Sequence, residues 1–164
     1  AALQNVDYLP RVIELDRRQP ESTLTFAQYR ERIVSPTRVR KGQAMLSRHS
    51  RVLKEVSEES GVAPQYIVAL WGLETSYGAI TGGFNYDGRR GAFFRGELLN
   101  ALKIIDEGHV PAGEIHGSWA GALGQNQFMP SSFHNFAVEG DGDGRADIWN
   151  NLHVVFASTA NYLV

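Results

Sequence analysis

Hydrophobic positions along the chain recur mostly at the three- and four-residue spacing of amphipathic helices. A short helix is predicted from Thr25, and a long helix is predicted to open at Ser35-Pro36 and to end at Gly61. The other predicted helices cover residues 64–77, 97–107, 130–137 and 150–163, with an ordered, glycine-rich loop over 108–129. No segment alternates as a strand hairpin would, so the sequence predicts a mainly α fold.

One predicted helix carries a carboxyl group on its apolar face. Ile67, Leu70 and Trp71 recur at helical spacing, and Glu74 continues this stripe toward the interior near the helix C-terminus. Contact with aliphatic and indole groups disfavours the charged carboxylate, as does the negative end of the helix dipole, so we expect a raised pKa. A glutamic acid that keeps its proton near neutral pH can act as a general acid. The alternative is a glutamate that turns to solvent or pairs with an arginine.

Composition excludes several classes of protein. The 164 residues, 43% of them hydrophobic, are enough for one compact domain, and the absence of cysteine excludes thiol catalysis, thiolate metal sites and disulfides. A net charge of −2 argues against general affinity for nucleic acid, although residues 1–54 carry +6 and the remainder −8. No apolar run reaches the about 20 residues of a membrane helix and Ala1 begins no signal peptide, so we expect a cytoplasmic protein or a processed, soluble piece of an exported one.

The acidic segment EGDGDGRADIWN, residues 139–150, fits the spacing of an EF-hand calcium loop. The predicted metal ligands are Glu139, Asp141, Asp143, Asp147 and the backbone carbonyl of Arg145. Gly144 falls at the glycine position of the template, but Asn150 stands where a bidentate glutamate is usual. We therefore expect weak affinity and a structural role for the calcium. The alternative is an acidic turn satisfied by its own backbone and by Arg145.

Two further motifs occur in a fixed order before this loop, WGLETSYG at 71–78 and SWAGALGQNQFMPSSF at 118–133. Together with the block at 86–102 and ASTANYL at 157–163, they resemble the lytic transglycosylase B family, bacterial enzymes that cleave the glycan strands of peptidoglycan. The resemblance covers most of the chain. It implies a lysozyme-like catalytic core over residues 61–164, incomplete at the C-terminus, after an N-terminal helical part over residues 1–60.

The resemblance assigns the catalytic role to Glu74 alone, with no cofactor for catalysis and a structural Ca²⁺ in the acidic loop. Glu74 protonates the glycosidic oxygen between N-acetylmuramic acid and N-acetylglucosamine, then accepts the proton of the sugar's C6 hydroxyl as a 1,6-anhydro ring closes. An ordinary glycosidase needs a second carboxylate, whereas an intramolecular nucleophile at high effective molarity dispenses with it. Asp87 and Glu97 are accordingly expected to be structural.

The same resemblance predicts the residues that contact substrate. Ser118 is expected to orient the Glu74 carboxyl group and Gln127 to contact sugar, while the groove is lined by Phe128, Met129, Tyr77 and Tyr162. The alternative for Ser118 and Gln127 is hydrogen bonding to the backbone of their own loop, and any one aromatic residue can belong to the core instead.

The implied partner is the peptidoglycan glycan strand, with no nucleic acid, in a monomer located in the periplasm. Membrane anchoring is expected only through a lipid upstream of this chain. Two departures from the family leave the substrate site partial: Tyr86 follows Asn85 directly where a further stretch is usual, and the chain stops at Val164. Two other functions stay open, a lysozyme-type hydrolase and a non-catalytic, calcium-stabilised peptidoglycan-binding module.

Overall fold

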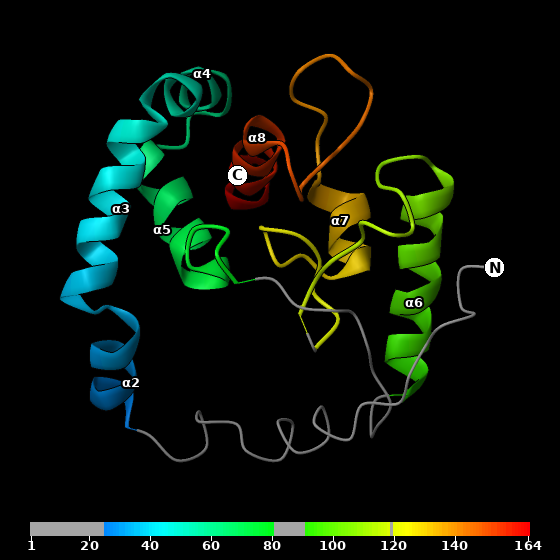
Figure 1. The fold of residues 1–164 in the computed structure, drawn as a ribbon, viewed down its shortest axis with the longest axis horizontal. Helices are drawn as coiled ribbons and strands as arrows, with labels where there is room; N and C mark the ends of the chain where they lie inside the picture. Colours follow the sequence, from blue (N-terminus) through cyan, green and yellow to red (C-terminus); the bar gives the residue numbers. More distant parts are fainter. Residues whose placement is uncertain (1–24, 81–90, 119) are drawn as a thin grey trace.

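The computed structural model of the protein describes residues 25–80, 91–118 and 120–164. In these ranges the chain forms seven helices and two isolated β-bridges, and no strand (Figure 1). The helices are α2 (Phe26–Ile33), α3 (Pro36–Arg48), α4 (Ser50–Ser60), α5 (Pro64–Thr75), α6 (Gly91–Asp106), α7 (Pro130–Phe136) and α8 (Leu152–Leu163). The predicted mainly α class is confirmed.

Local capping signals place several helix ends where the sequence predicts them. Thr25 forms a capping box with Gln28 at the start of α2. The Ser35 hydroxyl accepts a hydrogen bond from the Arg38 N–H at 3.2 Å, and Pro36 occupies the first turn of α3. Gly61 ends α4 in the left-handed conformation, with φ 76°. These ends depend on neighbours in sequence, which is why the pattern of residues suffices to locate them.

The single long helix predicted from Ser35 to Gly61 is wrong, because the chain breaks at His49 into α3 and α4. His49 adopts φ −107° and ψ 20°, and its ring lies edge-on to Trp71 and Phe156, with centroids 5.8 and 5.9 Å away. Burial against these rings, and then the charge of Arg48, lower the pKa of His49. After the break, α4 packs against α8.

The start of α6 also differs from its prediction. The helix begins at Gly91 rather than at Glu97. Glycines at 91 and 96 lower the helix propensity of this segment. Burial of Ala101 and Ile104 supplies the stabilisation that local propensity lacks.

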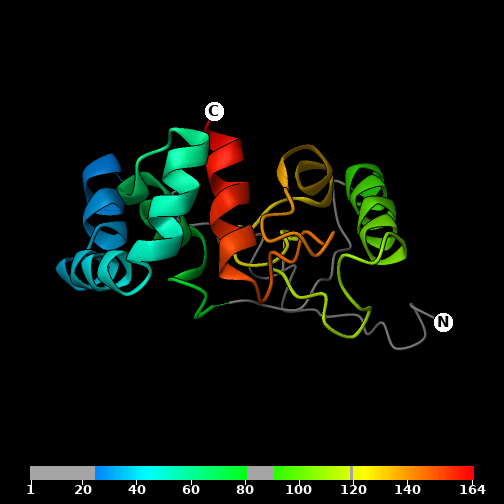
Figure 2. The same ribbon diagram turned by 90° about the horizontal axis from the view of Figure 1, so that it is seen from above.

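Two apolar clusters meet at α8, which lies between α5 and α7 (Figures 1 and 2). The α5 core contains Leu53, Val56, Ile67, Val68, Trp71, Val155, Phe156 and Ala160. The α7 core contains Ile104, Val110, Leu123, Phe128, Phe133, Ala146, Ile148, Trp149 and Val154. Successive residues of α8 therefore serve different clusters. The α5 core also extends across the predicted domain boundary at residue 60, since α4 contributes to it.

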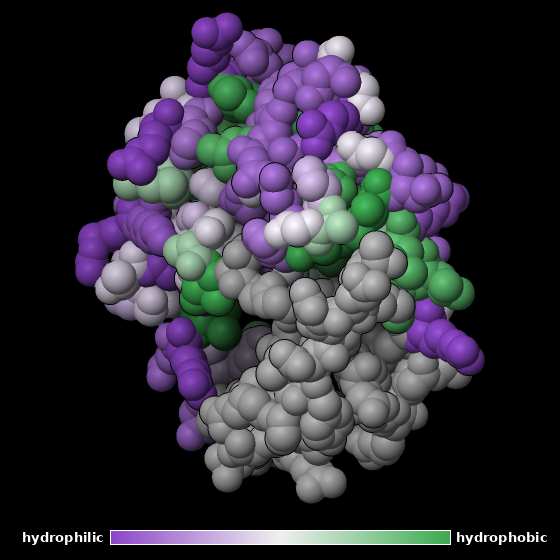
Figure 3. Space-filling model, turned by 45° about the vertical axis from the view of Figure 1, so that its right-hand side comes forward, coloured by the Kyte–Doolittle hydropathy of each residue, from purple (hydrophilic) through white to green (hydrophobic). Residues whose placement is uncertain are grey.

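Among the side chains that are coloured in Figure 3, hydrophilic ones cover most of the visible surface, and hydrophobic ones gather in several patches between them. Phe93 and Leu99 are among the large apolar residues that α6 exposes. Across the described parts of the chain, every helix is too short or too polar to cross a bilayer.

Candidate active site

Glu74 lies at the edge of the buried face of α5. That face is centred on Val68, Trp71 and Thr75, while Leu70 is only half-buried. The prediction that Glu74 points to the interior is therefore corrected: its side chain reaches solvent. Protein atoms still crowd its surroundings, and desolvation raises the pKa of Glu74, as predicted. A carboxyl group placed at the surface with a raised pKa can meet a large substrate and still carry a proton.

Directly after Glu74, α5 ends in a strained turn. We call residues 74–78 the Glu74 turn. Ser76, Tyr77 and Gly78 all take left-handed conformations, with φ 53°, 63° and 73°. For a residue with a side chain this conformation costs about 1–2 kcal/mol, so contacts elsewhere must hold it. One such contact is the ammonium group of Lys41 on α3, which donates to the Ser76 carbonyl at 2.8 Å.

Tyr77 holds the Glu74 turn against α3. Its hydroxyl donates to the Arg38 carbonyl at 2.8 Å, and its ring lies edge-on to Trp71 at 5.6 Å. A Cβ added at Gly72 would lie 2.5 Å from Cζ of this ring, and one at Gly42 would lie 2.8 Å from its hydroxyl oxygen. The glycines at these positions of α3 and α5 therefore leave the space that the Tyr77 ring occupies. The structure gives Tyr77 a packing role, and its contact with sugar stays a prediction.

Ser118 and Gln127 lie in a loop that two isolated β-bridges hold together, one between Leu123 and Gly117 and one between Leu123 and Phe128. The Ser118 hydroxyl accepts from the Ala122 N–H at 3.2 Å. Gln127 has φ 52°, and its amide donates to the Gly124 carbonyl at 2.8 Å. Both side chains hydrogen-bond the backbone of their own loop, the alternative that the sequence left open. Their contacts with Glu74 and with sugar stay predictions.

Three other residues predicted to line the groove, Phe128, Met129 and Tyr162, differ in their exposure to solvent. Phe128 is only 5% exposed and belongs to the α7 core, while Met129 is half-buried as the N-cap of α7. Tyr162 is 48% exposed, and its ring lies 5.5 Å from Phe128 and 5.0 Å from Phe136. Of these three, Tyr162 is therefore the residue most open to a sugar face, with Phe128 and Phe136 supporting it.

Gln125 and Thr75 organise this site, although no pattern in the sequence distinguishes them. The Gln125 side chain accepts from the Trp71 indole N–H at 2.9 Å and donates to the Trp149 carbonyl at 2.7 Å. The buried Thr75 hydroxyl lies 3.2 Å from the Gln125 carbonyl, to which it donates, and accepts from the Gly78 N–H at 3.0 Å. The available signal for a role of Gln125 was the polar run Gly-Gln-Asn-Gln at residues 124–127. This run does not show which of its two glutamines joins the loop to α5.

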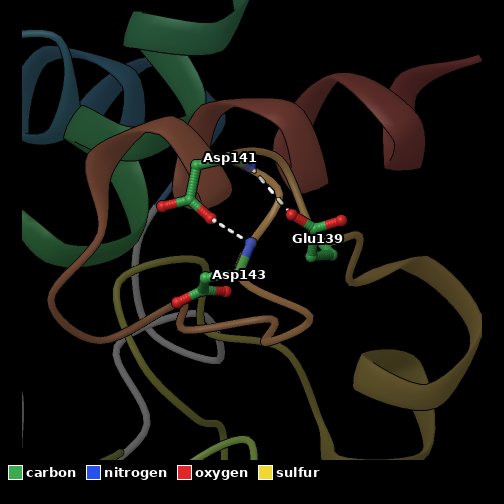
Figure 4. A group of neighbouring side chains, drawn as sticks. All are labelled: Glu139, Asp141 and Asp143. Carbon is green, nitrogen blue, oxygen red and sulfur yellow. Dashed lines mark hydrogen bonds between the residues drawn. The ribbon is translucent and has the colours of Figure 1, made fainter.

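The acidic loop follows α7 and precedes α8, so it has the helix–loop–helix setting of its template. Carboxylate oxygens of Glu139, Asp141 and Asp143 lie within 4.8 Å of one another, and all three residues are exposed (Figure 4). Oxygen donors at alternate positions of a loop suit Ca²⁺ chemically. Gly144, at the glycine position of the template, has φ 77°. The residues present therefore fit a calcium ion.

The other predicted ligands are placed differently. The Asp147 carboxylate lies outside this acidic group and accepts from the backbone N–H groups of Trp149 at 3.0 Å and Asn150 at 2.9 Å. The backbone N–H of Arg145 donates to Asp143 at 2.8 Å, and its guanidinium donates to the His109 carbonyl at 3.3 Å. Asp147 thus stabilises the turn before α8. Metal ligation by Asp147 and by the Arg145 carbonyl stays a prediction.

Comparison with known proteins decides the family. The sequence profile described as "Transglycosylase SLT domain" matches residues 1–164. The chain belongs to this family. It is 33% identical over 146 residues to membrane-bound lytic murein transglycosylase B of Escherichia coli K12. The aligned part covers 82% of this chain and 40% of that relative. The chain thus spans less than half the length of the curated relative it matches.

Solved structures of other transglycosylases have the same fold. SltB3 of Pseudomonas aeruginosa, in complex with NAG-anhNAM-pentapeptide, is 46% identical, with a TM-score of 0.91 over 99% of this chain and 46% of that one. Escherichia coli Slt35 in complex with calcium is 31% identical, with a TM-score of 0.82 over 98% of this chain and 54% of that one. The lysozyme-like fold predicted from the resemblance is confirmed.

In this transglycosylase domain Glu97 has a structural partner. It is 4% exposed and accepts from the Ser131 N–H and hydroxyl, both at 2.8 Å. Ser131 lies in the first turn of α7, where a carboxylate is favoured by unpaired N–H groups and by the helix dipole. The predicted structural role of Glu97 is confirmed. Asp87, predicted to be structural as well, lies outside the described residues.

Proposed function

We propose that this domain cleaves the MurNAc-β-1,4-GlcNAc bond of peptidoglycan and forms 1,6-anhydro-N-acetylmuramic acid. The observation that carries the proposal is Glu74: this carboxyl group lies in the last turn of α5, at the surface and with a raised pKa, in a chain of the transglycosylase SLT family. The SltB3 relative, whose structure contains NAG-anhNAM-pentapeptide, supports the product class.

Glu74 performs both proton transfers in the proposed reaction. Its protonated carboxyl group donates to the glycosidic oxygen while the bond from that oxygen to C1 of the muramic acid breaks. The resulting carboxylate accepts the proton of the C6 hydroxyl as its oxygen bonds to C1, which restores the protonated acid. The two steps balance without water as a reactant. They need no second carboxylate, because the nucleophile belongs to the substrate and is already close to C1.

Mass spectrometry of products released from purified sacculi tests the proposal. Transglycosylation yields muropeptides one water lighter than the reducing-end products of a lysozyme-type hydrolase, so one spectrum separates the two reactions. Anhydro products are the expected result. Reducing-end products would show a hydrolase instead, and binding to sacculi without released products would show a non-catalytic binding module.

The proposal includes the substrate groove and the setting of the enzyme. In it, Ser118 orients the Glu74 carboxyl group and Gln127 contacts sugar, while the groove is lined by Phe128, Met129, Tyr77 and Tyr162. The enzyme acts as a monomer on glycan strands in the periplasm, and a lipid upstream of this chain is the means by which a membrane-bound form is anchored. The murein transglycosylase B of Escherichia coli, described as membrane-bound, supports the cell-wall setting.

The activity is expected to fall on the alkaline side of its pH profile. Only protonated Glu74 can donate to the glycosidic oxygen, and desolvation raises its pKa, so kcat/KM should persist to a higher pH than an ordinary glutamic acid allows. By the same linkage, any stability that the protonated carboxyl contributes is lost as pH rises through the raised pKa. NMR titration of the free enzyme checks the assignment. A Glu74 carboxyl that titrates at or below the value of an ordinary glutamic acid contradicts it.

Calcium is proposed to be a structural ion held by Glu139, Asp141 and Asp143. It would link the start of the loop to its turn, and it takes no part in the proposed proton transfers. The Slt35 relative, solved in complex with calcium, supports this, as does the fit of the three carboxylates.

Calcium is expected to raise the melting temperature without being needed for cleavage. A ligand that binds only the native state stabilises it by about 2.7 kcal/mol at a hundredfold excess over Kd, and with Asn150 closing the loop we expect Kd of roughly 10⁻⁴ to 10⁻³ M. Asp143→Ala should abolish the shift, whereas the exposed Asp106→Ala on α6 should keep it. Two results would show that the loop is only an acidic turn. One is an equal melting temperature of the wild type in calcium and in chelator, and the other is a calcium-dependent rise in Asp143→Ala as large as in the wild type.

A further inference from the structure

Gln125 uses every hydrogen-bonding group it has to join two distant segments. Its backbone N–H donates to the Ile148 carbonyl at 3.0 Å and its side-chain amide donates to the Trp149 carbonyl at 2.7 Å. Its side-chain oxygen accepts from Trp71, and its backbone carbonyl accepts from Thr75. One half of these bonds anchors Gln125 to the segment before α8, and the other half reaches the last two turns of α5.

The two residues of α5 that Gln125 contacts flank Glu74. Trp71 lies three residues before Glu74, about one helical turn away, and is 4% exposed. Thr75 directly follows Glu74 and is fully buried. Because Trp71 and Thr75 are buried, their polar groups need protein partners. Gln125 accepts from the Trp71 indole N–H, and its carbonyl lies 3.2 Å from the Thr75 hydroxyl, which also lies 3.3 Å from the Trp71 carbonyl.

Gly78 gives independent evidence that the Glu74 turn is shaped around Gln125. A Cβ added at Gly78 would lie 2.4 Å from the side-chain oxygen of Gln125 and 3.7 Å from the Trp71 ring. The glycine that closes the E-T-x-x-G motif therefore leaves room for the Gln125 amide as well as permitting its own φ of 73°. The strained turn is held from one side by α3 and from the other by Gln125.

We propose that Gln125 is a positioning residue, which fixes the Glu74 turn so that the carboxyl group is aligned with the glycosidic oxygen. This inference rests on the proposed function and extends it to a residue that does not touch the substrate. General acid catalysis depends on placement of the proton donor, and an error of about 1 Å can cost about 10²-fold in rate. A turn whose backbone is strained is prone to such an error once a supporting contact is removed.

Gln125→Leu tests the proposal, because it removes both side-chain hydrogen bonds at nearly constant volume. Val110→Ala is the control for a general loss of stability, because it opens a small cavity in the α7 core, which contains no residue of α5. Trp71→Phe, which removes the indole donor, completes a double-mutant cycle with Gln125→Leu. All are compared below their melting temperatures on purified glycan strands.

We expect Gln125→Leu to lower kcat by about tenfold to 10²-fold with KM unchanged, because placement matters in the transition state. The loss should be smaller in the Trp71→Phe background, and NMR should show the Glu74 pKa falling toward its ordinary value as water reaches the loosened turn. An unchanged kcat, or a fall no larger than that of Val110→Ala, overturns the proposal.

The remaining outcomes are also decisive. If Gln125→Leu does not fold, Gln125→Glu keeps the acceptor for Trp71 but loses the donor to Trp149, and the same readouts apply to it. If the wild type releases no anhydro products, the proposed function fails by itself. In that case the NMR titration of Glu74 still decides the positioning, since an unmoved pKa in Gln125→Leu overturns it without reference to activity.

Discussion

Replacing Glu74 by glutamine is expected to abolish cleavage while leaving the fold intact. The amide fills nearly the same volume, and the side chain is exposed, so no core contact is lost. It can neither donate the first proton nor accept the second. General acid–base assistance is worth about 10² to 10⁴ in rate, and one residue serving both steps should place the loss at or above the top of that range.

Release of anhydro muropeptides from sacculi measures the loss, and circular dichroism with a melting curve checks the fold. Glu114→Gln is the matched control, since Glu114 is an exposed glutamate outside the site. We expect it to retain wild-type activity. A Glu74→Gln enzyme with more than about a tenth of wild-type activity would remove this residue from the mechanism.

Phe156→Ala is expected to lower the free energy of unfolding by about 3–5 kcal/mol, the cost of emptying a buried aromatic site. The Phe156 side chain is fully buried in the α5 core, and its ring lies 5.2 Å from Trp71 and 5.9 Å from His49. The alanine variant therefore leaves a cavity at the point where α8 meets α5 and the break between α3 and α4.

Denaturant titration gives the difference in unfolding free energy. Phe26→Ala is the control, because Phe26 is 79% exposed and exposed positions usually change stability by no more than about 0.5 kcal/mol. A loss in Phe156→Ala no greater than in this control would mean that the site collapses without a cavity. That result would also mean that the stability of the two cores depends less on α8 than their packing indicates.

Sequence predicted this fold best where the cause of an element is local. Ser35 and Gly61 mark the ends that they cap, and Pro130 marks the start of α7. The break at His49 was missed because its partners, Trp71 and Phe156, come much later in the chain. A helical pattern by itself cannot show which aromatic ring will fill a gap between helices.

The candidate site divides in the same way. The raised pKa of Glu74 followed from its apolar neighbours, but its exposure did not, because the buried face of α5 is centred on Val68 and Thr75 instead of Leu70. Gln125 was missed since Trp71 lies 54 residues before it and Trp149 lies 24 residues after it. The loop and the helix that it supports are brought together only by the folded chain.

The place of α8 between the two cores has a consequence for the order of folding. α8 follows every other described helix in the chain, yet both apolar clusters need its residues, Val154 in one and Val155 and Phe156 in the other. During synthesis neither cluster can pack fully until these residues have left the ribosome. Until then, the apolar faces of the earlier helices stay exposed to solvent. Once α8 docks, the two clusters share one element, and we expect them to melt in a single cooperative transition.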